Sequence, residues 1–250
     1  RFSGLDPKET ANFREHKMNV KDAPKLYGVE SERRNLNTAI EQFKEIDPAF
    51  VVVCGDMVND WGDEDQIALI RETLGEYGKE TPVHWVAGNH DIDLNNPSPD
   101  QDSVAEYRAE FGADYYEFTH GESKFIILNS VLLDQPENLQ DEHRRQMDFL
   151  GDTLRSREAR DSEHVVAFMH HPLFLESAQE SDSGFDWSPS PPNQSPGYWT
   201  VPLAQRTPVV KLLREANVQT VFAGHWHRNH VASDDGLDVV VTGALGYPLG

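Results

Sequence analysis

The chain has 250 residues, 38% of them hydrophobic, and carries 43 acidic against 22 basic residues for a net charge of −21. This length and apolar content suit one α/β domain with a sizeable core. The negative charge repels nucleic-acid backbones and anionic membrane surfaces, so we expect neither as a partner.

The hydrophobic pattern alternates between helical and strand periods along the chain. Helical spacing begins at Glu32, where Leu36, Ile40 and Phe43 recur on one face. Short β-branched runs that end in polar residues predict buried parallel strands. The further expected elements are, in chain order, a strand over 49–56, a helix over 64–78, strands over 81–91 and 124–131, a helix over 141–157, a strand over 163–172, a helix over 204–217 and strands over 218–227 and 238–246.

A segment without any period, residues 181–202, is rich in serine, proline and glycine. We expect a long ordered loop there, and such loops often carry function. Trp187, Tyr198 and Trp199 in this loop are interpreted as a wall of a substrate site, with pinning of the loop to the domain as the alternative. The alternation of strands and helices predicts a layered α/β fold.

Cysteine usage bears on the compartment. Cys54 is the only cysteine, so no intrachain disulfide can form, which favours a reducing, cytoplasmic setting. No apolar run approaches the ~20 residues that a membrane span needs. Secretion is not excluded, because the chain begins at Arg1 rather than at methionine.

Polar side chains follow four of the predicted apolar strands at the points where these strands end. They are Asp56, residues 89–91, residues 170–171 and residues 225–227. The ligand crevice of an open α/β sheet lies outside the carboxyl ends of its strands. The shared placement therefore predicts one site built from all four segments.

The residue types in these segments indicate a metal centre. A carboxylate, an amide oxygen and several imidazoles suit zinc, iron or manganese better than calcium or magnesium. Two ions bridged by a carboxylate, ~3.5–4 Å apart, can clamp a phosphoryl group and activate a water. A neighbouring histidine could then protonate the leaving alcohol.

Each segment alone has an ordinary explanation. The motif GD fits a strand-end turn, GNHD fits a turn rich in Asn and Asp, HHP fits the end of a strand, and GHWH fits surface histidines. Their occurrence in this order, at the ends of apolar strands, favours a single functional site.

The ordered motifs GDMVND, GNHD, HHP and GHWH resemble those of the calcineurin-like metallophosphoesterase superfamily, from about residue 32 onward. The segments VVVCGDMVN, HHPLFLES, VFAGHWHRN and LDVVVTGALGYPLG resemble in particular the calcineurin-like phosphoesterase domain-containing group of serine/threonine phosphatases. The resemblance implies an α/β fold with a four-layer β-sandwich flanked by helices. It also implies a dinuclear metal site at the C-terminal ends of the strands, holding two ions of Mn, Fe or Zn.

The resemblance assigns metal ligands by position. Asp56 would be the bridging carboxylate, and Asn89 would bind the second ion and orient the phosphate. His170 and His225 would complete the coordination of the second ion, and His227 would bind the first ion.

Catalytic and substrate-binding residues are assigned in the same way. His90 would be the general acid, with Asp91 orienting it. Arg228 is a candidate phosphate ligand, although a solvated loop arginine is the alternative. We expect His171 to point away from the site if its segment is extended, because successive side chains of a strand alternate between faces.

The sequence departs from the family at its first motif. Family members begin with a strand that ends in Asp-x-His or a variant, whereas Asp6 follows no apolar strand and Lys8 is no ligand while charged. We expect this motif to lie upstream of Arg1, with Asp6 as the alternative ligand. Residues 1–250 would then form a single metallophosphoesterase domain that lacks the first metal-ligand strand and the final strands.

The predicted function is hydrolysis of phosphate monoesters, including phosphoprotein, by a metal-activated hydroxide. A phosphodiesterase of the same fold and a non-catalytic protein-binding scaffold remain alternatives. A third is a metallo-β-lactamase-type enzyme, because HWHRNH, residues 225–230, resembles its His-x-His-x-Asp-His signature and would make His230 a ligand. The substrate and the oligomeric state are not predicted.

Overall fold

The computed structural model describes residues 29–92, 99–191 and 194–246. Asp6 lies outside these residues. The helices and strands are α2 (Val29–Ile46), β1 (Val51–Val53), α3 (Glu64–Tyr77), β2 (Val83–Trp85), α4 (Gln101–Phe111), β3 (Tyr116–His120), β4 (Ser123–Ile127), α5 (Val131–Asp134), α6 (Gln140–Arg155), α7 (Arg157–Asp161), β5 (His164–Phe168), α8 (Leu203–Glu215), β6 (Thr220–Ala223), β7 (His230–Asp234) and β8 (Leu237–Val241).

The strands form two sheets. Strands β1 and β2 pair in parallel, and the larger sheet has the order β3-β4-β5-β6-β8-β7. Its inner strands β4, β5, β6 and β8 are parallel, whereas β3 and β7 pair antiparallel at its edges. The α/β class expected from the sequence is confirmed. The edge strands and α4 were not expected.

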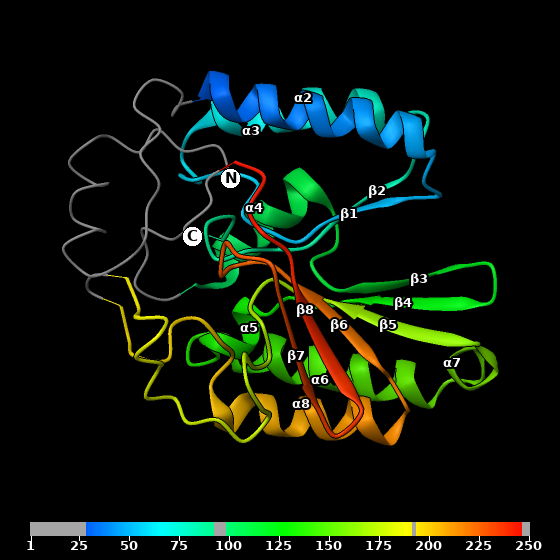
Figure 1. The fold of residues 1–250 in the computed structure, drawn as a ribbon, viewed down its shortest axis with the longest axis vertical. Helices are drawn as coiled ribbons and strands as arrows, with labels where there is room; N and C mark the ends of the chain where they lie inside the picture. Colours follow the sequence, from blue (N-terminus) through cyan, green and yellow to red (C-terminus); the bar gives the residue numbers. More distant parts are fainter. Residues whose placement is uncertain (1–28, 93–98, 192–193, 247–250) are drawn as a thin grey trace.

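Helices cover the outer face of each sheet (Figure 1). Helices α2 and α3 lie over β1 and β2, and α6 and α8 lie against the larger sheet. A third apolar cluster contains side chains from both sheets, including Val52 of β1, Phe168 of β5 and Phe222 of β6. The two sheets therefore face each other.

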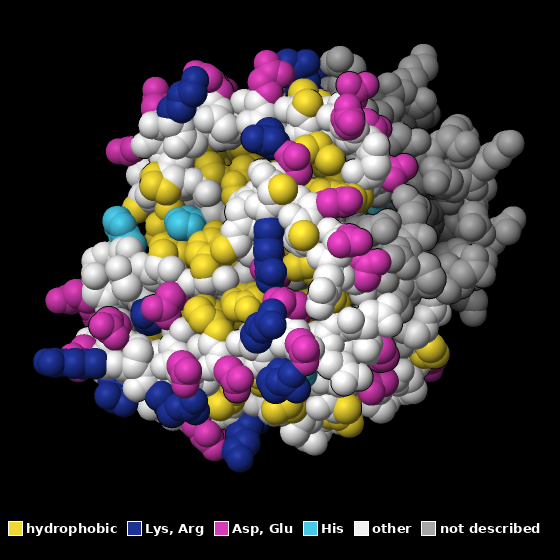
Figure 2. All heavy atoms as spheres, turned by 180° about the vertical axis from the view of Figure 1, so that it is seen from behind, with side chains coloured by type: hydrophobic (Ala, Val, Ile, Leu, Met, Phe, Trp, Pro, Cys, Tyr) yellow, Lys and Arg dark blue, Asp and Glu magenta, His cyan; other side chains and the backbone are white. Residues whose placement is uncertain are grey.

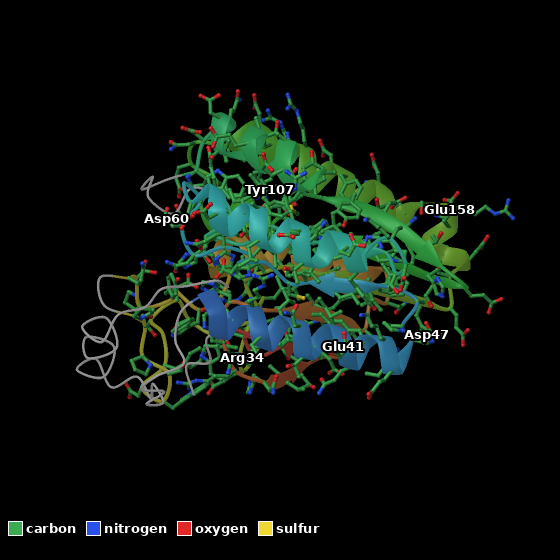
Figure 3. The ribbon with its side chains drawn as sticks, turned by 90° about the horizontal axis from the view of Figure 1, so that it is seen from above. Arg34, Glu41, Asp47, Asp60, Tyr107 and Glu158 are labelled. Atoms are coloured by element: carbon green, nitrogen blue, oxygen red, sulfur yellow. The ribbon has the colours of Figure 1, made fainter. Side chains whose placement is uncertain are left out.

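The amphipathic pattern of α2 explains its position. Leu36 and Ile40 are buried, as the helical spacing predicts, while Arg34 and Glu41 point away from the body. Figure 3 shows α2 and α3 lying next to each other, with their outer faces bearing the charged side chains.

The charged surface mixes both signs. Figure 2 shows acidic and basic side chains interspersed over one face of the molecule. Several form exposed pairs within a helix turn, such as Arg155 with Asp152 at 2.9 Å, and such pairs contribute little to stability. Within the described residues, no helix is both long enough and apolar enough to cross a membrane.

The segment between β5 and α8 is held by a buried arginine. Arg206 of α8 is 0% exposed, and its guanidinium donates hydrogen bonds to the carbonyls of Ala178, Glu180 and Val201. The Glu180 carboxylate in turn accepts backbone N–H bonds from residues 175–177. The ends of this segment are thus fixed by hydrogen bonds rather than by regular structure.

We expect Arg206→Met to lower the free energy of unfolding by about 3 kcal/mol or more, because three carbonyl groups would lose their buried donor. Urea unfolding monitored by tryptophan fluorescence measures this loss. Arg144→Met, which changes an exposed arginine of α6, is the matched control and should stay within about 0.5 kcal/mol of the parent. An equally stable Arg206→Met protein would show that these bonds do not hold the segment.

Candidate metal centre

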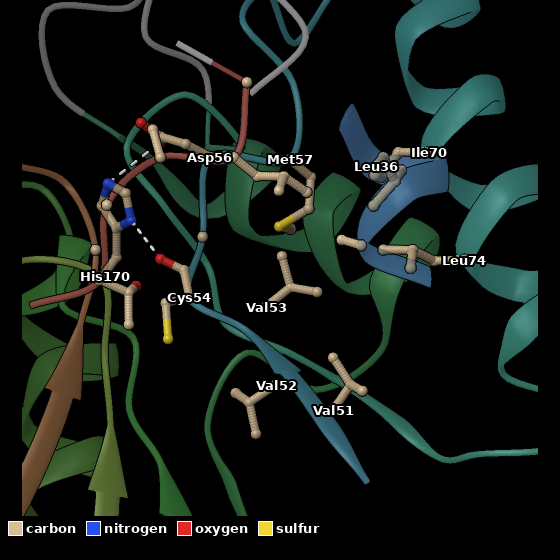
Figure 4. A pocket seen from close by; sticks show the side chains of 18 of the residues that line it. Leu36, Val51, Val52, Val53, Cys54, Asp56, Met57, Ile70, Leu74 and His170 are labelled. Atoms are coloured by element: carbon tan, nitrogen blue, oxygen red, sulfur yellow. Dashed lines mark hydrogen bonds and ion pairs between the residues drawn. The ribbon is translucent and has the colours of Figure 1, made fainter. Parts of the chain in front are cut away.

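Four segments that follow strands converge at one edge of the sheets. Asp56 follows β1, Asn89 follows β2, His170 follows β5 and His225 follows β6. Their parallel strands end on the same side, which brings the segments together as the sequence predicts. Asp56 and His170 lie at one end of the cavity drawn in Figure 4.

The four side chains are in close contact. His170 Nε2 lies 3.1 Å from His225 Nδ1, 3.1 Å from Asn89 Oδ1 and 3.3 Å from Asp56 Oδ1. His225 Nδ1 and Asn89 Oδ1 are also 3.1 Å apart. Asp56, His170 and His225 are buried, and Asn89 is half-buried.

In both His170 and His225, the ring nitrogen that points away from the cluster is hydrogen-bonded to a backbone carbonyl. His170 Nδ1 donates to the Cys54 carbonyl at 2.7 Å, and His225 Nε2 donates to the Tyr198 carbonyl at 3.0 Å. In the neutral rings, the two nitrogens that face each other then carry lone pairs. Together with the two oxygens they form a group of four acceptors with no donor among them, which fits a bound cation.

Charge in the cluster shifts the pKa values of its members. Burial lowers the pKa of His170, but the adjacent Asp56 more than offsets this, so the net pKa is raised. Burial lowers the pKa of His225 well below its usual value. The Asp56 carboxylate therefore favours a positive charge at this position of the cluster.

His227 lies apart from the tight cluster. It is buried and lines a cavity of about 250 Å³ together with Asp56, His170 and His225. The opposite wall of this cavity is apolar and includes Leu36, Val53, Met57, Ile70 and Leu74 (Figure 4). His227 thus lines the same cavity as Asp56, and its role as a ligand of the first ion stays a prediction.

Three of the predicted ligands have unusual backbone conformations. Asp56, His225 and His227 have φ values of 55°, 62° and 58°. This left-handed region disfavours side chains that carry a Cβ, at about 1–2 kcal/mol per residue. Such strain is typical of functional positions that the surrounding structure holds in place.

Glycines allow the segments to approach each other. A Cβ on Gly88 would lie 2.3 Å from the Asp56 backbone nitrogen, and a Cβ on Gly55 would lie 2.4 Å from His170 Nδ1. Gly55 also has a φ of 86°. The glycine that precedes Asp56 and the one that precedes Asn89 are therefore required by packing.

We expect Gly88→Ala to destabilise the protein by about 2–3 kcal/mol, because backbone must move to make room for the methyl group. The movement would displace Asp56, so metal affinity should fall as well. Gly121→Ala is the control: its added Cβ meets no atom within 4 Å, although its φ is also positive, at 59°. Thermal unfolding with and without metal measures both effects, and equal losses in the two variants would contradict the packing argument.

His90 is held by the Asp56 carboxylate and by a backbone carbonyl three residues further along the chain. Its N–H donates to Asp56 Oδ1 at 3.1 Å, and its ring Nδ1 donates to the Asn59 carbonyl at 2.7 Å. The orienting role of Asp91 stays a prediction: its two oxygens accept backbone N–H bonds, from Val58 at 3.2 Å and Gly88 at 2.9 Å.

Asp91 therefore ties together the two segments that carry Asp56 and Asn89. Burial, followed by the charge of Asp56, raises the pKa of Asp91 to about 7. The orienting contact to His90 comes from a backbone carbonyl, which the residue pattern could not reveal.

His171 is the residue that sequence reasoning missed. It does not point away: a ring nitrogen of His171 lies within 4.8 Å of ring nitrogens of both His170 and His225. The segment after Phe168 is no longer strand, so the expected alternation of faces does not apply. Burial lowers the pKa of His171 well below its usual value.

The other predicted residues lie around the cluster. Arg228 stacks over Trp226, with its guanidinium carbon 5.2 Å from the ring centroid. His230 begins β7 and lies 2.7 Å from the Leu175 carbonyl, as a donor of a structural hydrogen bond. Tyr198 packs against His225 with ring centroids 4.6 Å apart and the ring planes tilted by 49°, so the loop 181–202 does border the cluster.

Comparisons with known proteins identify a family and relatives for this chain. The family model described as calcineurin-like phosphoesterase matches residues 26–229. The human serine/threonine-protein phosphatase CPPED1 is 30% identical over 228 residues, which cover 88% of this chain and 67% of the relative. The chain thus spans about two thirds of the length of that relative.

Two solved structures share the fold. Purple acid phosphatase PPD1 from yellow lupin (Lupinus luteus) seeds has a TM-score of 0.61 at 17% identity, over 87% of this chain and 40% of that one. GAP50, the anchor in the inner membrane complex of Plasmodium, has a TM-score of 0.59 at 15% identity, over 91% and 69%. At these identities the likeness concerns the fold alone.

Proposed function

The chain belongs to the calcineurin-like phosphoesterase family, and we propose that it is a metal-dependent phosphomonoesterase acting on phosphoprotein or on a small phosphate ester. The observation that carries the proposal is the group of four buried or half-buried acceptors from Asp56, Asn89, His170 and His225, which holds no donor. The named phosphatase relative supports the monoester class.

We propose two metal ions, of Mn, Fe or Zn, as the resident cofactors. Asn89, His170 and His225 would hold one ion, His227 would hold the other, and Asp56 would bridge them. When bound, such ions supply positive charge to the phosphoryl group and lower the pKa of a bound water. The two facing sheets support the four-layer sandwich implied by the family resemblance.

The protein's own groups would position and protonate the substrate. The Asn59 carbonyl fixes His90 Nδ1 as a donor, so Nε2 is the atom that would pass a proton to the leaving alcohol. Asn89 would orient a phosphate oxygen through its amide, and Arg228, which follows His227 in the sequence, would make a further contact. The loop 181–202 would wall the site beside Tyr198.

The test combines metal analysis of the protein with turnover measurements on a set of phosphate esters. The protein is stripped with a chelator and reloaded with Mn, Fe or Zn. Turnover is then measured on aryl and alkyl monoesters, a phosphopeptide and a bis-aryl diester. We expect metal-dependent monoester hydrolysis. A preference for the diester would identify the phosphodiesterase alternative, and metal binding without turnover would identify the scaffold.

The metallo-β-lactamase alternative is tested by His230→Ala. Because the His230 ring is hydrogen-bonded to the Leu175 carbonyl, we expect metal content to stay unchanged. Loss of about one equivalent of metal would make His230 a ligand and reject our assignment.

A further inference from the structure

The hydroxyl of Ser130 is hydrogen-bonded to both His170 and His171, which are adjacent in the sequence. Its oxygen accepts the backbone N–H of His170 at 3.2 Å and of His171 at 2.8 Å. The same oxygen lies 2.8 Å from His171 Nδ1. Ser130 is 0% exposed and His171 is 1% exposed, so water does not compete for these bonds.

Counting donors fixes the tautomer of His171. A hydroxyl has two lone pairs and one hydrogen. Both lone pairs of Ser130 receive backbone N–H groups, whose protons cannot move elsewhere. The hydroxyl hydrogen must therefore go to His171 Nδ1, and the neutral imidazole carries its own hydrogen on Nε2.

This tautomer removes His171 from the possible metal ligands. A ligating nitrogen needs a free lone pair, but Nδ1 is taken by Ser130 and Nε2 is protonated. His171 nevertheless lies at the candidate metal centre, because its ring packs against that of His225 with centroids 4.2 Å apart. The three histidines that lie together thus comprise two candidate ligands and one N–H donor.

We propose that Ser130 is a positioning residue that withholds His171 from the metal, and that His171 donates its Nε2–H to a phosphoryl oxygen of the substrate. The inference rests on the proposed function. Among the described residues none is hydrogen-bonded to this Nε2. An N–H beside a cation site is repelled by the cation and suits an anionic oxygen, as donors at phosphoryl-transfer sites do.

Two amide substitutions separate the possible roles of His171. The amide of asparagine overlaps the Nδ1 position and can still accept from Ser130, whereas that of glutamine reaches the Nε2 position and retains a donor there. We expect metal content to be unchanged in both. We expect kcat/KM for 4-nitrophenyl phosphate to be about 10-fold or more lower in His171→Asn than in His171→Gln. Metal loss in both, or equal losses of kcat/KM, would overturn the donor role.

The tautomer itself is measured without activity. Long-range ¹H–¹⁵N NMR of histidine-labelled, metal-free protein should show His171 protonated at Nε2 and unprotonated at Nδ1. Ser130→Ala should lose this preference, while Ser156→Ala, which removes a helix-capping hydroxyl elsewhere, should keep it. A protonated Nδ1 in the parent protein would overturn the inference even if the protein is a phosphatase. Absence of turnover with an Nε2–H tautomer would instead reject the proposed function.

Discussion

Asp56→Asn is expected to abolish metal binding and to lower kcat/KM by at least about 10³-fold. Asp56 is the only carboxylate within 3.3 Å of His170 among the described residues, and the amide of asparagine cannot bridge two cations. Asparagine keeps the size of the side chain and the acceptor for the His90 N–H, so the fold around it should persist. Metal stoichiometry by mass spectrometry and turnover on 4-nitrophenyl phosphate measure the two losses.

The free energy of unfolding of Asp56→Asn provides a second measurement. We expect metal-free Asp56→Asn to be no less stable than the parent, because the buried charge that opposes Asp91 is removed. The stabilisation that metal gives the parent, about 2.7 kcal/mol at 100 times the Kd, should be absent.

Asp114→Asn is the matched control for a buried acid. Asp114 is 1% exposed and pairs with Arg108 at 2.6 Å, away from the centre. We expect Asp114→Asn to have a lower free energy of unfolding than the parent but an unchanged metal content. If Asp56→Asn still binds metal, Asp56 is not a metal ligand.

His90→Ala is expected to lower kcat by about 10²- to 10⁴-fold while metal content stays unchanged. The ring Nδ1 is bonded to the Asn59 carbonyl, so Nε2 is the ring nitrogen that would protonate the leaving oxygen in the proposed reaction. The loss should be larger for an alkyl phosphate than for 4-nitrophenyl phosphate, because a good leaving group needs less protonation. Comparing the two substrates separates this role from simple binding.

His164→Ala controls for the loss of an imidazole. His164 begins β5 and is exposed, and it should leave kcat and metal content unchanged. Equal losses of kcat for both substrates in His90→Ala would reject the acid role and indicate a purely electrostatic one.

The inner parallel strands and the long helices were predictable because their residues follow a single period. Leu36 and Ile40 mark α2, and the β-branched run of 51–53 marks β1. The edge strand β3 was missed because its residues alternate only between half-buried and exposed, with Glu117 and His120 among them. An edge strand with one wet face carries little hydrophobic signal.

The site was predictable to the level of segments but not of contacts. Glycine and polar residues after apolar strands located Asp56, Asn89, His170 and His225. The partner of His90 is a backbone carbonyl, and every residue type has one, so its identity was not visible. Likewise, the direction of a side chain one residue beyond a strand, as in the HHP motif, depends on dihedral angles that the sequence does not specify.

The left-handed backbone at Asp56, His225 and His227 has an evolutionary consequence. Glycine and asparagine adopt this conformation at lower cost, so each replacement of a ligand by one of them would make the metal-free protein more stable. In a lineage released from selection for catalysis, these three positions are therefore expected to drift first, while the rest of the fold is preserved. Overall identity between homologues is then a poor guide to activity, and the residues at these three positions are the better one.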